Sequence, residues 1–320
     1  MKARIIDVGK YVPNLSISNE DFTKIMDTNN EWIVQRTGIS SRHFSEINTS
    51  EMAYQAVLNL LENTKFNKED IEIIIVCTCT PDAYSPSVAN LVKKKLKLSK
   101  DIPSFDINAA CSGFIYGLKV VQGLIESGLY QNIILVGSEN LSKLLNFDDR
   151  STAVLFGDGA GAILVQGSNQ GIIDTLIYNK DDINGAINIP NGINIETPFT
   201  NNQCSGPAHI QMKGQDVFKF ATKVCINMLK EIVVKNNLTF NDIKCIIPHQ
   251  ANLRIIEYAI KMLGINKDKF VITLESLGNT SSASIPIALD SIKKELKKGD
   301  KLIFVAFGGG LTYGVSLLEW

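Results

Sequence analysis

The chain has 320 residues, of which 45% are hydrophobic and 20% charged, and its formal net charge is −1. This composition is typical of a water-soluble protein with one large or two medium domains, and the charge gives no general support for binding to nucleic acid or an anionic membrane. No apolar run approaches the ~20 residues of a membrane-spanning helix. We therefore expect a cytoplasmic protein without membrane insertion.

In the first half of the chain, apolar runs alternate with a segment of helical periodicity. The runs 71–76 and 105–107 are predicted strands, and the apolar residues of 112–127 recur at helical spacing. Two further apolar strands, over 132–139 and 159–166, close this half. Strands that alternate with helices predict βαβ units and largely parallel sheets.

The second half repeats this order. A polar segment precedes a strand at 243–247, as one precedes the strand at 71, and a helix is predicted over 281–297. Two strands then follow, over 301–310 and 314–320. We expect two similar α/β halves facing one another, residues 1–170 and 171–320, divided at the glycine-rich turn 167–171.

Cys111 lies where the strand at 105–107 passes into the helix at 112–127. At a helix N-terminus, unpaired backbone N–H groups and the helix dipole favour a thiolate over a thiol. Cys111 is therefore a candidate nucleophile for attack on a carbonyl carbon. The alternative is that it is a small buried apolar residue, as many cysteines are.

Asn279 and His249 are predicted to meet Cys111. Asn279 follows Ile243 by 36 residues and Cys111 follows Ile71 by 40, so the two residues end equivalent strands of the duplication. His249 comes just after the strand at 243–247, and the carboxyl ends of parallel strands share one edge of a sheet. Taken alone, His249 also fits a hydrogen-bonded buried histidine, and His43 and His209 lack such a setting.

The other cysteines indicate no metal site. The six cysteines are scattered along the chain, which fits reduced thiols better than a disulfide framework. Cys77 and Cys79 end an apolar run in which residues alternate faces, and no Cys or His group of metal-ligand spacing accompanies them. We interpret both as residues that pack within a strand.

Six motifs, in order, resemble the β-ketoacyl-acyl carrier protein synthase III family of the thiolase-like condensing enzymes. They are NEWIVQRTGI at 30–39, DINAACSGF at 106–114, LFGDGAGA at 155–162, PHQANLRII at 248–256, GNTSSASIP at 278–286 and AFGGGLTYG at 306–314. The resemblance implies a thiolase-like fold, with two pseudo-symmetric halves in an αβαβα arrangement. It also implies that Cys111, His249 and Asn279 are the catalytic residues.

The resemblance implies a decarboxylating Claisen condensation. An acyl-CoA primer would acylate Cys111, and malonyl-acyl carrier protein would then lose CO2 and attack the acyl group, giving 3-ketoacyl-acyl carrier protein and free CoA. His249 and Asn279 would stabilise the enolate, and the backbone N–H groups of Cys111 and Gly309 would form an oxyanion hole. The alternative for glycines 308–310, a tight turn, is compatible with this role. Asn279 stands where the chain-elongating branch has a second histidine, which indicates the initiating branch of type II fatty acid biosynthesis.

The resemblance also assigns the binding residues, a homodimer, and no cofactor or metal. The residues that match coenzyme A contacts are Thr28, Trp32, Arg36, Arg150 and Asn252. Those that match contacts with the acidic acyl carrier protein are Gln250, Ala251, Asn252, Leu253, Arg254, Lys219 and Lys261. Charge complementarity would steer the carrier protein to these cations.

Ser85 stands where members of the family have an aromatic residue that reaches into the acyl pocket of the partner subunit. A serine there predicts a larger pocket, and therefore primers longer or more branched than acetyl. Two alternatives to the initiating function remain open. One is a related condensing enzyme of secondary metabolism with other acyl donors or acceptors, and the other is a cysteine hydrolase that cleaves a thioester.

Overall fold

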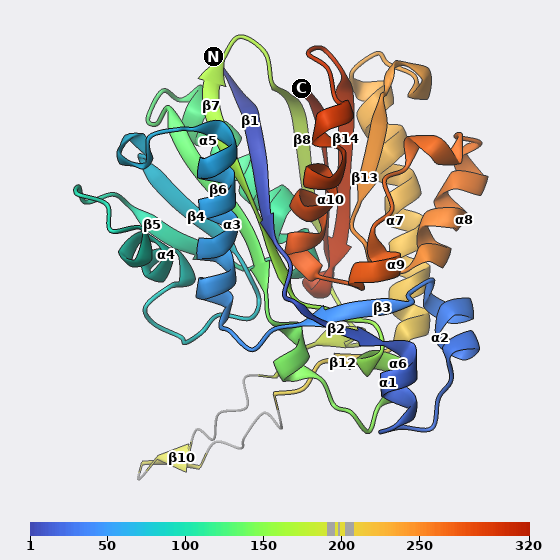
Figure 1. The fold of residues 1–320 in the computed structure, drawn as a ribbon. Coiled ribbons are helices and arrows are strands. Elements are labelled where there is room, and N and C mark those ends of the chain that lie inside the picture. The colour runs from blue at the N-terminus through green and yellow to red at the C-terminus, as the bar shows by residue number, and fades with distance from the viewer. Residues whose placement is uncertain (191–195, 198, 202–207) are drawn as a thin grey trace.

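Two β-sheets, one from each half of the chain, form the framework of the computed structural model, which describes residues 1–190, 196–197, 199–201 and 208–320 (Figure 1). The first sheet has the strand order β1-β7-β6-β4-β5 and the second the order β13-β14-β15-β8. The strands of the first are β1 (Lys2–Tyr11), β4 (Ile73–Cys77), β5 (Ser104–Ile107), β6 (Asn132–Glu139) and β7 (Gly159–Ser168). Those of the second are β8 (Ile172–Asn179), β13 (Cys245–Pro248), β14 (Lys301–Gly308) and β15 (Thr312–Glu319).

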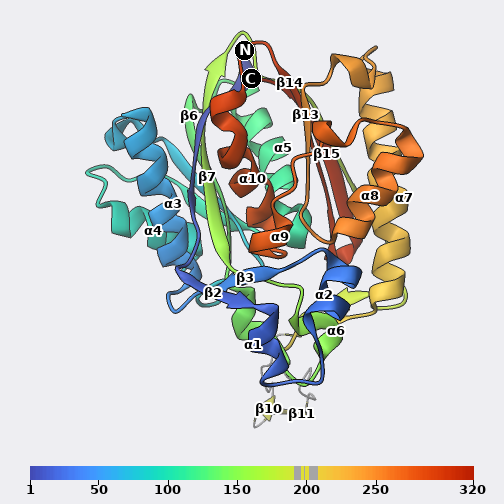
Figure 2. The ribbon, with the colours of Figure 1, turned by 45° about the vertical axis from the view of Figure 1, so that its right-hand side comes forward.

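Helices cover both sheets and fill the space between them (Figures 1 and 2). α3 (Thr49–Thr64) and α4 (Val88–Leu96) pack on the outer face of the first sheet, whereas α7 (Gly214–Lys235) and α8 (Leu253–Leu263) pack outside the second. α5 (Gly113–Glu126) and α10 (Ser284–Ile292) lie between the sheets. The result is the predicted αβαβα layering of the thiolase-like fold.

The continuous apolar runs of the sequence become the central strands because those strands are covered on both faces. Every residue of β4 is buried, and so are seven of the eight residues of β6. A strand with one solvated face would instead alternate apolar and polar residues. The burial therefore explains why these runs lack the alternating pattern.

The two sheets repeat one topology. β1, β7, β6 and β4 pair in the same order and directions as β8, β15, β14 and β13, with only the last pair of each set parallel. The fifth strand, β5, has no full counterpart in the described part of the second half, where Phe270 forms an isolated bridge to Ile246. The predicted helix over 281–297 is divided into η6 (Ser281–Ala283), α10 and η7 (Lys293–Glu295).

The segment after β1 crosses to the second half of the chain. It contains β2 (Leu15–Ser18), α1 (Asn19–Thr23), α2 (Asn30–Thr37) and β3 (Ser41–Phe44), and its apolar residues join the core that contains α7 and α8. The Ser40 N–H group donates a hydrogen bond to the Glu275 carbonyl (2.7 Å), which ties the segment to the second half. Residues of the first half thereby come to lie beside α8.

The remaining elements are short. The helices are α6 (Arg150–Ala153) and α9 (Leu274–Leu277), and the strands are β9 (Ile187–Asn188), β10 (Glu196–Thr197), β11 (Thr200–Asn201) and β12 (Gln211–Met212). The other 3₁₀ turns are η1 (Lys68–Asp70), η2 (Ala110–Ser112), η3 (Leu141–Leu144), η4 (Phe240–Asp242), η5 (Lys267–Lys269) and η8 (Gly309–Leu311). Among the helices of the described residues, none has the length and apolar character needed to cross a membrane.

Gly137 of β6 allows η6 to approach the first sheet. A β-carbon at Gly137 would lie 2.8 Å from the carbonyl carbon of Ser282, whereas one at Gly123 of α5 would meet nothing within 4 Å. We expect Gly137→Ala to destabilise the protein by about 1–3 kcal/mol through overpacking. Gly123→Ala should be neutral or stabilising by up to ~1 kcal/mol, because alanine is the better helix former.

Urea unfolding followed by circular dichroism compares the two variants with the parent. An unfolding midpoint of Gly137→Ala at or above that of Gly123→Ala would contradict the close packing of η6 on β6.

Candidate active site

Cys111 lies in η2, at the junction between β5 and α5, and is 7% exposed. The Asn108 side chain accepts a hydrogen bond from the Ala110 N–H group (3.1 Å), and Ala110 itself has a positive φ of 47°. The next residue, Ser112, donates its hydroxyl to the Thr312 carbonyl in the other half of the chain (3.0 Å). The nucleophile predicted from the sequence is therefore held at the N-terminal end of α5, as expected.

The glycine-rich segment after β14 packs directly on Cys111. A β-carbon at Gly308 would lie 2.7 Å from the Cys111 amide nitrogen, so this approach requires glycine. The Thr312 hydroxyl lies 2.9 Å from the carbonyl oxygens of both Ala109 and Gly309, which bridges the two segments. The backbone of Gly309 thus lies near that of Cys111. Gly309 and Gly310 also lie in the turn η8, so the alternative interpretation of these glycines as a tight turn holds as well.

His249 follows β13 and is 2% exposed. Its backbone N–H group donates to the Val305 carbonyl (2.8 Å), and its ring packs edge-on against Phe307, with the ring centroids 5.5 Å apart. Nδ1 lies 2.9 Å from the Ser284 hydroxyl. Because burial disfavours the imidazolium, the pKa of His249 falls to about 3. The ring is therefore neutral at pH 7.

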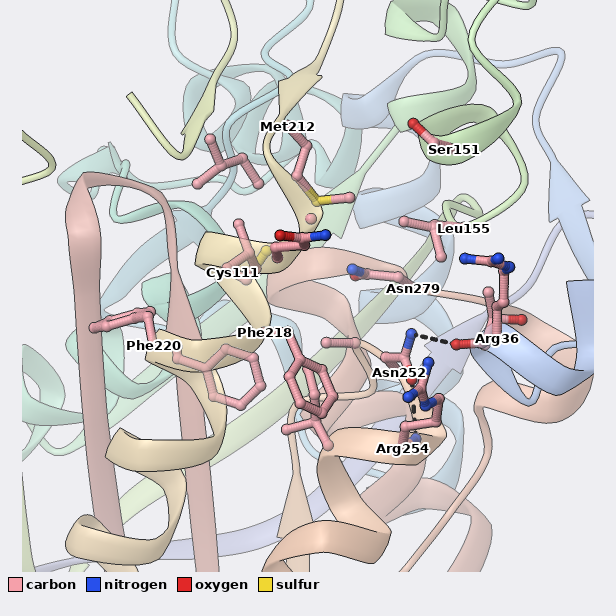
Figure 3. A pocket seen from close by; sticks show the side chains of 18 of the residues that line it. Arg36, Cys111, Ser151, Leu155, Met212, Phe218, Phe220, Asn252, Arg254 and Asn279 are labelled. Carbon is pink, nitrogen blue, oxygen red and sulfur yellow. Dashed lines mark hydrogen bonds between the residues drawn. The ribbon is translucent and has the colours of Figure 1, made fainter. Parts of the chain in front are cut away.

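Asn279 lies between α9 and η6 and is joined to the first half of the chain, so the prediction that it ends a strand is wrong. Its N–H group donates to the Leu155 carbonyl (2.9 Å), and its carbonyl accepts from the Gly157 N–H group (3.0 Å). The side-chain oxygen Oδ1 accepts from the Ser281 N–H group (2.9 Å), which leaves Nδ2 as a donor. Figure 3 shows the amide end of Asn279 turned toward Cys111.

One cavity brings these three residues together, as predicted. It has a volume of about 610 Å³, and its lining includes Cys111, His249 and Asn279 as well as Trp32 and Asn252. Figure 3 shows Cys111, Asn252 and Asn279 in the wall of this cavity. A second cavity, of about 740 Å³, also has Cys111 in its wall. Cys111 therefore lies in the wall of both cavities, and His249 and Asn279 line the first of them.

Burial dominates the electrostatics of the nucleophile. Loss of solvent raises the pKa of Cys111 to about 12; a hydrogen bond from the Ser281 hydroxyl lowers it, and the Glu139 carboxylate raises it further. The expectation that the helix N-terminus makes the thiolate the favoured form is therefore wrong for this structure. The reason is that desolvation outweighs the helix dipole, whose effect is worth ~2 kcal/mol at most.

The predicted coenzyme A residues gather at Trp32. The Cζ atoms of Arg36 and Arg150 lie 4.7 and 5.0 Å from the centre of its ring. The Asn252 side chain donates to the Arg36 carbonyl (3.0 Å), and the Thr28 hydroxyl oxygen is buried without a partner among the described residues. Since Arg150 contacts Trp32 directly, a planar base can enter between them only if the guanidinium moves.

The predicted carrier-protein residues divide into two groups. Arg254, Lys219 and Lys261 are exposed, and the Arg254 guanidinium lies over the Phe218 ring with its Cζ atom 5.6 Å from the ring centre. Ala251, Asn252 and Leu253 are partly buried. Gln250 is only 1% exposed, and its amide binds the backbone of Pro248, Val271, Thr273 and Leu274. Gln250 therefore has no side-chain surface to offer a partner, and its predicted contact is wrong.

Sequence analysis missed a buried carboxylate behind Cys111. Glu139, at the end of β6, is fully buried and accepts hydrogen bonds from the hydroxyls of Thr80 and Ser282, both at 2.8 Å, and from the Cys79 N–H group (3.1 Å). Burial raises its pKa. In the sequence, the one feature that points to Glu139 is its place at the carboxyl end of the strand at 132–139.

Cys79 is also misassigned by sequence analysis. The thiol lies beyond the end of β4, 3.4 Å from the Glu139 carboxylate and 4.0 Å from the Ser281 hydroxyl, and it lines the second cavity with Cys111. Only Cys77 packs within the strand as expected. In the part of the chain that the structure describes, Cys77, Cys79, Cys111, Cys225 and Cys245 are free thiols, as predicted.

The fold and the site together define the class of the protein. Its two pseudo-symmetric halves, with a cysteine, a histidine and an asparagine meeting between them, are those of a thiolase-like condensing enzyme. Residues 105–180 match the family described as 3-oxoacyl-[acyl-carrier-protein] synthase III, and residues 233–320 match its C-terminal part. The names 3-oxoacyl and β-ketoacyl denote the same acyl group. The chain belongs to the β-ketoacyl-acyl carrier protein synthase III family.

Individual relatives agree over the full length. The chain is 46% identical to β-ketoacyl-[acyl-carrier-protein] synthase III of Clostridium perfringens strain SM101, with 99% of each chain covered. Among solved structures, 3-oxoacyl-[acyl-carrier-protein] synthase III from Aquifex aeolicus VF5 has a TM-score of 0.92 at 39% identity, over 99% of this chain and 100% of that one. The priming β-ketosynthase of the R1128 polyketide pathway has a TM-score of 0.91 at 30% identity, over 99% of this chain and 96% of that one.

The raised pKa of Cys111 predicts how its reactivity depends on pH. With a pKa of about 12, the thiolate fraction should rise about tenfold for each pH unit between pH 7 and 10 without reaching a plateau. The rate of iodoacetamide labelling of Cys111, read by peptide mass spectrometry with Cys111→Ser as the control, should follow the same slope. A plateau near pH 8 would instead mean that the helix N-terminus outweighs burial.

Proposed function

We propose that the protein joins an acyl-CoA primer to malonyl-acyl carrier protein in a decarboxylating Claisen condensation, the initiating step of type II fatty acid synthesis. The products are 3-ketoacyl-acyl carrier protein, CoA and CO2. The observation that carries the proposal is the single cavity that contains Cys111, His249 and Asn279. Membership of the synthase III family supports the same reaction.

The first half-reaction loads the primer on Cys111. The sulfur attacks the thioester carbonyl of the acyl-CoA, the bond from that carbon to the CoA sulfur breaks, and CoA leaves as a thiol with the proton that Cys111 gives up. Covalent capture divides a difficult step into two easier ones. The backbone N–H groups of Cys111 and Gly309 would hold the oxyanion, because the Gly308 segment packs against Cys111.

The second half-reaction forms the carbon–carbon bond. The malonyl group loses CO2, and the electron pair left behind forms an enolate whose oxygen accepts hydrogen bonds from His249 and Asn279. The enolate carbon attacks the acyl carbonyl, and the Cys111 sulfur leaves as a thiolate that takes up a proton from solvent to restore the thiol. Since His249 is neutral at pH 7, it stabilises the charge as an N–H dipole and not as a cation. No step requires a metal or a further cofactor.

The surroundings of the cavity fit the two proposed substrates. Trp32, Arg36 and Arg150 offer an aromatic face and cations to the nucleotide of coenzyme A, and Asn252 lines the same cavity as Trp32 and Arg36. The exposed cations Lys219, Arg254 and Lys261 lie on α7 and α8, where they would attract an acidic carrier protein. Ala251, Asn252 and Leu253 lie beside Arg254 at the start of α8.

A homodimer is proposed through the edge of the first sheet. β5 is the last strand of that sheet, and its Phe105 leaves 38% of its surface exposed. An open strand edge with an exposed aromatic residue favours pairing with a second copy. We place this reaction in the cytoplasm, where the acyl-CoA and the carrier protein would be available.

The second cavity is the proposed primer site. Its wall contains Cys111 and the apolar side chains of Leu141, Leu144, Ile189 and Ile210. Ser85 is exposed, so it could face a partner subunit without adding the bulk of an aromatic ring. This supports primers longer or more branched than acetyl. The similarity to a priming ketosynthase of polyketide synthesis keeps a related condensation with other acyl groups as the second candidate.

Incubation with acyl-CoA thioesters from acetyl to medium and branched chains tests the loading step. We expect one acyl adduct by intact-protein mass, absent from Cys111→Ser, with a C4 to C6 or branched primer loading at least as fast as acetyl. Addition of malonyl-acyl carrier protein should then release CO2 and give the 3-ketoacyl product. Free acid in place of that product would indicate a hydrolase, and strict preference for acetyl would contradict the larger primer site.

Trp32→Ala tests the proposed nucleotide contact. Loss of the ring should raise KM for acyl-CoA about tenfold with little change in kcat, because the nucleotide takes no part in the bond changes and its contact stabilises substrate and transition state equally. Steady-state kinetics with saturating malonyl-acyl carrier protein would measure both constants. Tyr258→Ala, a partly exposed aromatic residue on α8 outside the lining of the first cavity, is the control. An unchanged KM for acyl-CoA in Trp32→Ala would contradict the proposed contact between Trp32 and the nucleotide.

A further inference from the structure

Ser284, the first residue of α10, lies against the catalytic histidine and has no part in the mechanism so far. It belongs to the motif at 278–286, which also contains Asn279, and it is 2% exposed. Its hydroxyl oxygen is 2.9 Å from His249 Nδ1 and 3.4 Å from the Gln250 backbone nitrogen. We propose that Ser284 is a positioning residue that fixes His249 in the tautomer with its proton on Nε2.

The argument depends on where the Ser284 hydroxyl proton goes. Within the described residues, the hydroxyl has two hydrogen-bond neighbours, and the Gln250 N–H group can only donate. If His249 Nδ1 also carried a proton, the hydroxyl would have no acceptor. A buried donor without a partner costs about 1–3 kcal/mol. The arrangement that satisfies every group has Gln250 donating to Ser284 and Ser284 donating to Nδ1.

The ring proton is therefore left on Nε2. The His249 ring lines the first cavity and, since Nδ1 is occupied by Ser284, Nε2 is the nitrogen available to a substrate. Burial keeps the ring neutral, so only one nitrogen carries a proton at pH 7. In the other tautomer, Nε2 would present a lone pair to the enolate oxygen, which would repel the developing charge.

The same motif fixes the second donor. The Ser281 N–H group binds Asn279 Oδ1 at 2.9 Å, so the amide presents Nδ2 and not its oxygen. Residues 281 and 284 thus orient Asn279 and His249 by separate hydrogen bonds. Preorganised donors of this kind are effective because they need no rearrangement when charge develops.

The inference rests on the proposed function, and its first test does not depend on activity. Nitrogen-15 NMR of protein labelled at its three histidines, with His249→Ala used to assign the signals, reports which ring nitrogen carries the proton. We expect the Nε2 proton in the parent protein at pH 7 and a mixture of tautomers in Ser284→Ala. A proton on Nδ1 in the parent would overturn the inference.

Kinetics of the separate half-reactions provide the second test. Ser284→Ala should lower the rate of CO2 release from malonyl-acyl carrier protein about 10-fold to 100-fold, while acylation of Cys111 by acyl-CoA stays within about threefold. Ser284→Thr, which keeps the hydroxyl, should restore most of the CO2 release. If Ser284 had only a structural role, Ser284→Ala would lower the rates of CO2 release and of Cys111 acylation by similar factors.

Ser316→Ala is the matched control. Ser316 is a fully buried serine of β15 with one hydroxyl hydrogen bond, to Thr175 at 3.0 Å, so its loss removes a comparable group without touching His249. Equal rates of CO2 release in Ser284→Ala and Ser316→Ala would overturn the inference. If the parent protein itself neither released CO2 nor condensed, the proposed function would fail, whereas the NMR result would still stand.

Discussion

The backbone pairing between residues 155–157 and Asn279 is the constraint on which the site depends. These segments come from opposite halves of the chain, and two hydrogen bonds of 2.9 and 3.0 Å join them. Ser282 extends the junction, because its hydroxyl lies 2.8 Å from both the Cys77 carbonyl and the Glu139 carboxylate. The proposed catalytic groups come from both halves, so any sliding of one half on the other would separate Cys111 from Asn279.

The buried position of the nucleophile has an electrostatic consequence. Cys111 and His249 are both neutral at pH 7, because burial raises the pKa of the thiol to about 12 and lowers that of the ring to about 3. A resting thiolate–imidazolium pair is therefore not the state that this site favours. The thiol must lose its proton as it attacks, which couples acylation to protonation of the departing CoA sulfur.

Much of the architecture could be predicted because it depends on periodicity and on duplication. The strand at 71–76, the helix at 112–127 and the paired strands that close each half appear close to their predicted bounds. Cys111 and His249 could also be predicted, since each follows a strand. Asn279 could be predicted from the spacing of the duplication, although it follows the helix α9 and not a strand. The division of the helix at 281–297 could not, because the apolar periodicity does not distinguish the 3₁₀ turns η6 and η7 from the α-helix between them.

Two of the errors in the site share one physical cause. The sequence predicts a carrier-protein contact for Gln250 and packing within a strand for Cys79, whereas Gln250 is buried and Cys79 lines a cavity. Both residues lie just after the end of a fully buried strand, β13 for Gln250 and β4 for Cys79, where the regular strand geometry stops and the chain turns. Beyond that point, only tertiary packing decides whether a side chain points into the protein, as for Gln250, or into a cavity, as for Cys79.

The neutral resting state explains why the donors must be oriented in advance. A charged histidine would have N–H groups on both ring nitrogens and would donate from either side, but burial excludes that form. A neutral ring has one N–H group, and an amide donates from one end only. A change of tautomer at His249 or a flip of the Asn279 amide would therefore turn a donor into an acceptor. The fold prevents both reversals with short hydrogen bonds from the segment that also joins the two halves. Residues 279–284 thus both join the two halves of the chain and orient the two proposed donors. A substitution in this segment is therefore expected to affect folding and catalysis together.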